Sequence, residues 1–150
     1  MPVATDSPVT YAPEVTTNVL PASASFATEY DAVVAAIGTY IAGGRAGNSS
    51  LMRPSFLADA TMVGHAGGEL YTGAIERLYE WIDANGPAPD LVTRFASVDI
   101  HETIAVVHLE AERWSGKFTG SEVHMSDAFT LVKTADGWRI AHKIFHWFGQ

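Results

Sequence analysis

The stretch that decides the fold is SDAFTLVKTADGWRIAHKIFHW, residues 126–147. Apolar and polar residues alternate over 126–134 and again over 138–147, which is typical of half-buried strands. Between the two runs stands Asp136-Gly137, a strong signal for a two-residue turn. The spacing therefore predicts an antiparallel hairpin near the end of the chain.

The register of this hairpin gives the first candidate site. If Asp136 and Gly137 form the loop, Asp127 lies opposite His146, with opposed Cβ atoms about 4.5–5.5 Å apart. We interpret the pair as a proton-transfer dyad, in which Asp127 orients the imidazole and His146 accepts the proton. A structural hydrogen bond that ties the hairpin together is the alternative. A three-residue loop would slip the register and move His146 to the other face.

The chain before the hairpin predicts helices followed by strands. Helical periodicity covers 29–42 and 74–84, and a short helix is expected over 48–56. A short strand over 60–65 turns at Gly67-Gly68 before the last helix. Strands are expected over 91–101 and 104–114, ahead of the terminal hairpin.

This order predicts an α+β fold, with helices grouped against one face of a curved antiparallel sheet. The Pro-rich and Thr-rich residues 1–25 read as an extended or disordered arm, and 26–150 as one domain.

Composition excludes several classes of protein. The net charge is −8 and the few basic residues are scattered, so we expect no nucleic-acid partner. No apolar run approaches the roughly 20 residues of a membrane span, and no signal peptide is visible, so we expect a cytoplasmic protein without a membrane partner. The chain has no cysteine, which excludes disulfides and thiolate chemistry.

Two further histidines are candidate functional residues. His142 lies four residues before His146, but in a strand that separation spans about 13 Å, so a zinc site is not expected and we predict no metal. His65 ends a predicted strand and is a candidate general base, with a surface turn residue as the alternative.

The sequence also resembles a known family. The segments YIAGGRAGN (40–48), LMRPSF (51–56), DAFTLVK (127–133) and GWRIAHKIFH (137–146) are similar to the putative lumazine-binding branch of the nuclear transport factor 2-like, or SnoaL-like, superfamily. The resemblance covers about residues 28–148. It implies a cone-shaped domain, in which a strongly curved antiparallel sheet wraps around three N-terminal helices and leaves a pocket at its open end. It also implies a homodimer formed through the outer sheet face. It does not determine an activity, because this fold carries many functions.

Three hypotheses follow. The first is an enzyme that needs no cofactor and moves protons in an isomerase, lyase or cyclase reaction on a small apolar carbonyl-bearing or cyclic substrate. His146, Asp127, His65 and Tyr40 would be its catalytic residues. The second is a non-catalytic binding protein for a pterin- or flavin-like heterocycle, and the third is a scaffold. In the first two, the expected ligand-binding residues are Tyr30, Trp81, Phe95, Trp114, Phe129 and His142.

Overall fold

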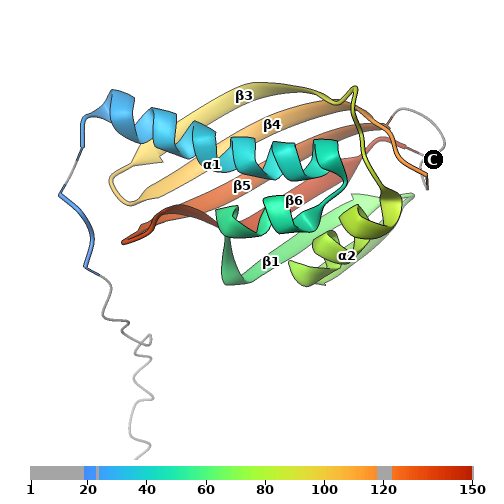
Figure 1. Ribbon diagram of the computed structural model, residues 1–150, viewed down its shortest axis with the longest axis horizontal. Helices are drawn as coiled ribbons and strands as arrows, with labels where there is room; N and C mark the ends of the chain where they lie inside the picture. The colour runs from blue at the N-terminus through green and yellow to red at the C-terminus, as the bar shows by residue number, and fades with distance from the viewer. Residues whose placement is uncertain (1–18, 23, 118–122, 150) are drawn as a thin grey trace, which may run out of the picture.

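Two helices lie against the concave side of a curved six-stranded sheet in the computed structural model (Figure 1). The structure describes residues 19–22, 24–117 and 123–149. The predicted arm over 1–25 therefore falls almost entirely outside the described residues. The elements are α1 (Phe26–Ala46), two 3-10 turns η1 (Ser49–Leu51) and η2 (Arg53–Ser55), β1 (Phe56–Ala66), β2 (Glu69–Ala74), α2 (Glu76–Asn85), β3 (Val92–His101), β4 (Ile104–Trp114), β5 (Val123–Thr134) and β6 (Gly137–Trp147).

The sheet has the strand order β2-β1-β6-β5-β4-β3. Neighbouring strands are antiparallel except for β1 and β6, which are parallel. The α+β prediction is confirmed, but the sheet is mixed where a purely antiparallel one was expected. The parallel pair joins two strands that are far apart in the sequence, so no local turn signal could indicate it.

Helix α1 is longer than predicted at both ends. Its N-cap is Ser25, whose side chain accepts a hydrogen bond from the backbone of Thr28, and it ends at Gly47 with φ of 63°. The helix continues through Gly43 and Gly44 because both allow close packing. A Cβ on Gly44 would lie 2.7 Å from the ring of Trp114.

Of the two other predicted helices, one is found and one is not. The short helix expected over 48–56 is instead the pair of 3-10 turns, and β1 starts directly after them at Phe56. The Gly67-Gly68 hairpin turn and the following helix are found as expected. Neither described helix combines the length and the apolar character needed to cross a membrane.

The terminal hairpin forms, but its register differs from the prediction. Its loop is Ala135-Asp136, so Thr134 pairs with Gly137, and a β-bulge follows where the register shifts between Leu131 and Thr130. Asp127 consequently pairs with Phe145 and not with His146. The predicted opposition of Asp127 and His146 is therefore wrong.

The bulge also changes which face of β6 is buried. Trp138 and Ile140 point into the core before it, and Lys143 points into the core after it. An unbroken alternation would have turned His142, Ile144 and His146 inward. Phe145 and Trp147, which regular alternation from Trp138 would place on the outer face, instead line the interior.

Candidate functional site

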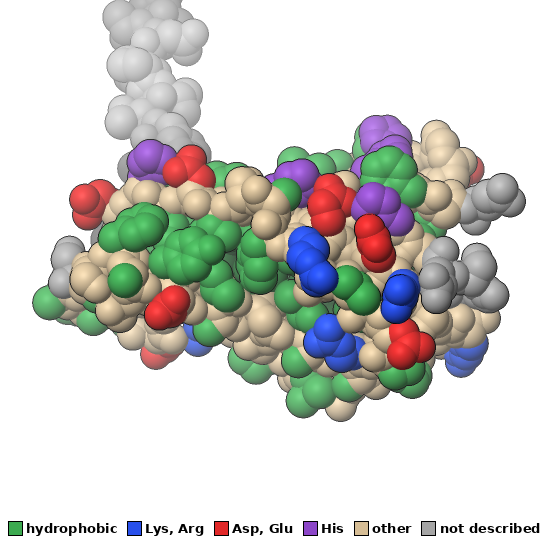
Figure 2. Space-filling view, turned by 90° about the horizontal axis from the view of Figure 1, so that it is seen from above, with side chains coloured by type: hydrophobic (Ala, Val, Ile, Leu, Met, Phe, Trp, Pro, Cys, Tyr) green, Lys and Arg blue, Asp and Glu red, His purple; other side chains and the backbone are tan. Residues whose placement is uncertain are grey.

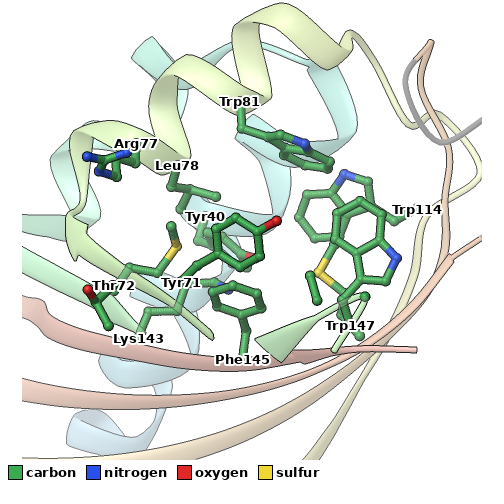
Figure 3. Close-up of a pocket in the computed structure, with 14 residues that line it drawn as sticks. Tyr40, Tyr71, Thr72, Arg77, Leu78, Trp81, Trp114, Lys143, Phe145 and Trp147 are labelled. Atoms are coloured by element: carbon green, nitrogen blue, oxygen red, sulfur yellow. The ribbon is translucent and has the colours of Figure 1, made fainter. Parts of the chain in front are cut away.

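A pocket of about 480 Å³ opens between the β1–β2 hairpin, α2 and the inner face of β4, β5 and β6 (Figure 3). Its walls are mainly aromatic and aliphatic, with a few polar groups among them, as is usual for small-molecule sites. The lining residues are Tyr40, Met62, Ala66, Gly67, Tyr71, Thr72, Arg77, Leu78, Trp81, Trp114, Met125, Lys143, Phe145 and Trp147.

A buried ion pair lies at the inner end of this pocket. The Lys143 ammonium donates to Oδ1 of Asp127 at 2.6 Å, and the Tyr40 hydroxyl donates to Oδ2 at 3.0 Å. The exposed fractions are 2% for Lys143, 0% for Asp127 and 1% for Tyr40. Both carboxylate oxygens are therefore occupied, and Lys143 and Tyr40 separate Asp127 from the pocket.

Three separate elements supply this triad. Tyr40 belongs to the buried stripe of α1 that also contains Val33 and Ile37. Asp127 lies on the inward face of β5, and Lys143 enters the same layer of the sheet because the bulge in β6 turns it inward. The site therefore depends on helix docking and on the irregular strand register together.

Aromatic rings surround the Lys143 ammonium. Its Nζ lies 4.7 Å from the ring centroid of Phe145, 5.8 Å from that of Tyr40 and 6.0 Å from that of Phe129. Rings at such distances attract a cation through their quadrupoles. They also exclude water, which strengthens electrostatic interactions between Lys143, Asp127 and any bound ligand.

Tyr40 is a neutral donor in this arrangement. Burial raises the pKa of its hydroxyl well above the usual value, and the negative charge of Asp127 raises it further. The phenol therefore stays protonated over the physiological range and continues to hold the second carboxylate oxygen.

Three tryptophans form the wall of the pocket nearest the end of β6. The Trp81 ring lies 6.2 Å from that of Trp114 and 5.4 Å from that of Trp147, the latter edge to face. The Nε1 atom of Trp114 is buried and has no hydrogen-bond partner among the described residues. An unpaired buried donor costs free energy, because it has lost its hydrogen bonds to water.

The polar groups of the pocket are mostly hydrogen-bond donors. Lys143, Arg77 and the tryptophan N–H groups only donate, whereas the hydroxyl groups can also accept. Within the described part of the chain, no carboxylate or imidazole lines the pocket. Such a lining suits a ligand with acceptor atoms, for example a carbonyl oxygen.

The histidines predicted as site residues lie outside the pocket. His146 is exposed on the outer face of the sheet, where it contacts Phe148, and His65 is exposed on the neighbouring strand at the same level. His142 is also on the outer side and shares a 2.6 Å hydrogen bond with Thr61. The dyad of Asp127 and His146 does not form, because the bulge places the two side chains on opposite faces.

The predicted aromatic wall is found only in part. Trp81 and Trp114 line the pocket, while Phe129 is fully buried behind it and packs 5.1 Å from the ring of Tyr40. Tyr30 and Phe95 are partly exposed and do not line it, because Tyr30 lies near the solvent-exposed start of α1 and Phe95 lies on the edge strand β3. Of the predicted catalytic residues, Asp127 and Tyr40 are brought together.

The outer face of the sheet carries a separate polar cluster. Glu110 accepts hydrogen bonds from Ser126 and shares others with His108 and His124, and these contacts lower the pKa of its carboxyl group. Figure 2 shows histidine and acidic side chains next to one another on the molecular surface. Among the described residues, no group of three or more His, Asp or Glu side chains is arranged to hold a metal ion.

Lys143 is the functional candidate that sequence reasoning missed. Regular alternation from Trp138 places it on the outer face, and a lysine is usually exposed. One signal was present: Phe145 and Trp147 share its alternation, and a bulge after Ile140 would bring these aromatic residues to the buried side.

Comparison with known proteins assigns the family. A family model described as "Putative lumazine-binding" matches residues 28–146. The aldolase FrzH of Cladobotryum sp is 28% identical over 119 residues, which cover 79% of this chain and 91% of that protein.

Two solved structures share the fold closely. An NTF2-like protein of unknown function from Shewanella baltica OS155 is 29% identical with a TM-score of 0.77, covering 85% of this chain and all of that one. A second, from Methylobacillus flagellatus KT, is 30% identical with a TM-score of 0.75, covering 87% of this chain and all of that one. The chain therefore belongs to the putative lumazine-binding family and has the nuclear transport factor 2-like fold.

Proposed function

We propose that this protein is an enzyme that uses no cofactor and catalyses proton transfer on a small, largely apolar carbonyl compound bound in the pocket. The observation that carries the proposal is the ion pair of Lys143 and Asp127, buried at the inner end of a mostly apolar cavity. A substrate carbonyl oxygen placed beside Lys143 would be polarised by a cation in a water-poor environment. Polarisation of this kind acidifies the adjacent carbon atom, which is the first requirement of isomerase and lyase reactions.

The family comparison supports a lyase-type reaction. The relative FrzH is named an aldolase, and aldol reactions join or cleave carbon–carbon bonds next to a carbonyl group. A pocket that stabilises the enolate of a bound ketone or aldehyde could serve such chemistry. In this proposal Lys143 contacts the substrate, and Asp127 holds Lys143 and exchanges a proton with it.

The test is deuterium exchange, because it detects enolate formation without knowledge of the final product. A panel of small aryl alkyl ketones and arylacetaldehydes, which carry α protons, is incubated with the protein in D2O, and the loss of α-proton signals is followed by NMR. We expect exchange above the buffer rate for at least one compound, and a fall of at least 100-fold in Lys143→Met.

The matched control is Lys133→Met, which removes a lysine that is also paired with a carboxylate but does not line the pocket. It should retain the wild-type exchange rate. Exchange at the buffer rate across the whole panel, or equal exchange in wild type and Lys143→Met, would contradict the proposal.

A second candidate function is binding of a heterocyclic metabolite without conversion. The observation that favours it is the tryptophan wall of Trp81, Trp114 and Trp147, which offers aromatic surface to a flat ligand. The test is titration with lumazine and riboflavin while tryptophan fluorescence is recorded, with Trp147→Leu for comparison. Saturable quenching in wild type that weakens in Trp147→Leu, together with no deuterium exchange, would favour binding over catalysis.

We also propose a homodimer through the outer sheet face. Ile104, Val106 and Ile144 leave about half of their surface exposed there, and a second copy would cover them. Sedimentation equilibrium of wild type and Val106→Glu tests this: a dimer is expected for the wild type and a monomer for the variant. A monomeric wild type at all concentrations would exclude the dimer.

A further inference from the structure

The Lys143 amine has the surroundings of a nucleophile. We propose that Lys143 forms a Schiff base with the carbonyl carbon of an aldehyde or ketone substrate, and that Asp127 accepts and returns the proton this requires. The inference rests on the proposed function, because it specifies how the same pocket would activate a carbonyl compound.

The lining of the pocket favours a covalent route. No carboxylate or imidazole is among the described lining residues, so the basic group available to a carbonyl compound is the amine of Lys143, with Asp127 behind it. Lys143 is the amine that lines the cavity in the described structure. Once it has lost a proton, it can attack a carbonyl carbon directly, as catalytic lysines do in apolar sites.

Asp127 is placed to accept that proton. Its Oδ1 lies 2.6 Å from Nζ of Lys143, so the proton moves along an existing hydrogen bond. Charges separated in an apolar environment are costly, and transfer of this proton gives a neutral amine and a neutral carboxyl group. Tyr40 donates to Oδ2 throughout and keeps the carboxyl group in position.

The proposed steps balance in atoms and charge. The Nζ lone pair bonds to the carbonyl carbon, the π electrons move to oxygen, and proton transfers give a neutral carbinolamine. Asp127 then returns its proton to the hydroxyl group, which leaves as water, and the nitrogen lone pair forms the C=N⁺ bond. The products are an iminium ion, one water molecule and the Asp127 carboxylate. That carboxylate stays paired with the new cation.

The lining also specifies the class of substrate. The carbonyl group must reach Nζ past Phe145, and the body of the molecule would contact Trp81 and Trp147. A neutral aryl or polycyclic aldehyde or ketone fits this description. Arg77, at the α2 side of the pocket, could accommodate an acceptor or anionic group at the far end of the substrate (Figure 3).

Reductive trapping tests the inference. The chain contains only three lysines, Lys117, Lys133 and Lys143, so the site of labelling can be read without ambiguity. The full-length protein is incubated with 2-naphthaldehyde as the probe and treated with sodium borohydride, and the adduct is located by peptide mass spectrometry. We expect one naphthylmethyl group on Lys143 in wild type and in Lys133→Arg, and none at position 143 in Lys143→Arg.

The initial trapping rate should fall by at least 10-fold in Asp127→Asn, because the amide cannot accept the lysine proton. If circular dichroism shows that Lys143→Arg or Asp127→Asn does not fold, the position of the adduct in the wild-type protein still tests the inference. Label confined to the N-terminus, Lys117 or Lys133 would overturn the inference. A deuterium exchange that requires Lys143 without any borohydride-stable adduct would also overturn it, while leaving the proposed function intact.

Discussion

Two carboxylates in this protein have the same kinds of hydrogen-bond partner in different surroundings. Asp127 accepts from Lys143 and from the hydroxyl of Tyr40. Glu29 accepts from Lys133 and, at 2.7 Å, from the indole N–H of Trp138. Each carboxylate thus accepts hydrogen bonds from one lysine and one aromatic donor. In both cases these hydrogen bonds link α1 to the β5–β6 hairpin.

The difference between the two sites is their access to water and to the pocket. The side chains of Glu29 and Lys133 remain 13% and 10% exposed, whereas those of Asp127 and Lys143 are 0% and 2% exposed. Lys143 lines the cavity and Lys133 does not. The comparison shows that a carboxylate, a lysine and an aromatic donor can link a helix to the sheet near the surface or beside a cavity, and only the second placement brings the lysine to a ligand site.

The largest expected effect comes from breaking the inner pair. Lys143→Met leaves the Asp127 carboxylate buried without its cation, and we expect a loss of about 3–5 kcal/mol in the free energy of unfolding. Lys133→Met should cost no more than about 1 kcal/mol, because water can solvate Glu29. Urea unfolding of both variants measures the contrast, and equal losses would show that burial does not separate the two sites.

The second prediction concerns replacement of both members of the inner pair. The double variant Lys143→Met, Asp127→Leu removes both charges, so no buried charge is left unpaired, and we expect stability within about 2 kcal/mol of wild type. Deuterium exchange should nevertheless stay at the buffer rate. Recovery of stability without activity would separate the structural role of the pair from its proposed chemical role. A double variant less stable than Lys143→Met would contradict the prediction.

The third prediction is a pH dependence at the outer site. The hydrogen bond from Lys133 lowers the pKa of Glu29 below its usual value of 4.5, and the bond from Trp138 lowers it further. A carboxylate whose pKa is lower when folded adds stability that is complete above the unfolded pKa and is lost as the pH falls through the folded pKa. The stability difference between wild type and Glu29→Gln should therefore be constant near neutral pH and shrink below 4.5. A difference that grows on acidification would reverse the expected sign.

The smallest effect is the response to salt. The coupling of Glu29 with Lys133, from a double-mutant cycle, should fall by a few tenths of a kcal/mol at about 1 M NaCl, because screening acts on partly exposed charges. The coupling of Asp127 with Lys143 should change less, since ions do not enter the buried site. A larger salt response at the inner pair would indicate that water reaches it.

Much of the fold could be predicted because its signals are local. The strand over 104–114 has the predicted bounds, and the Gly67-Gly68 turn is where the sequence indicates it. The stripe of Val33, Ile37 and Tyr40 is buried as the helical period requires. The parallel pairing of β1 with β6 could not be predicted in this way, because it depends on contacts between distant parts of the chain.

The candidate site could be predicted only in part. Asp127, Tyr40, Trp81 and Trp114 were named from the sequence, and the structure brings Asp127 into contact with Tyr40 and places the two tryptophans in the pocket. Lys143 was missed and His146 was wrongly placed, both for one reason. A bulge adds a single residue to one strand, and its one mark in this sequence is that Phe145 and Trp147 share the alternation of Lys143.

That bulge reverses, for every later residue of β6, which face of the sheet its side chain occupies. With the extra residue, the second half of the strand presents Lys143, Phe145 and Trp147 to the interior. Without it, the same half of the strand would present His142, Ile144 and His146 to the interior. Loss of one residue near Ala141 would thus replace the lysine amine in the cavity by imidazole groups, and gain of the residue would reverse the change. The side chains that the other elements contribute to the cavity would stay as they are. For a fold that carries many activities, insertion and deletion in a single strand offer a shorter evolutionary route between reactions than stepwise substitution of the residues around the cavity.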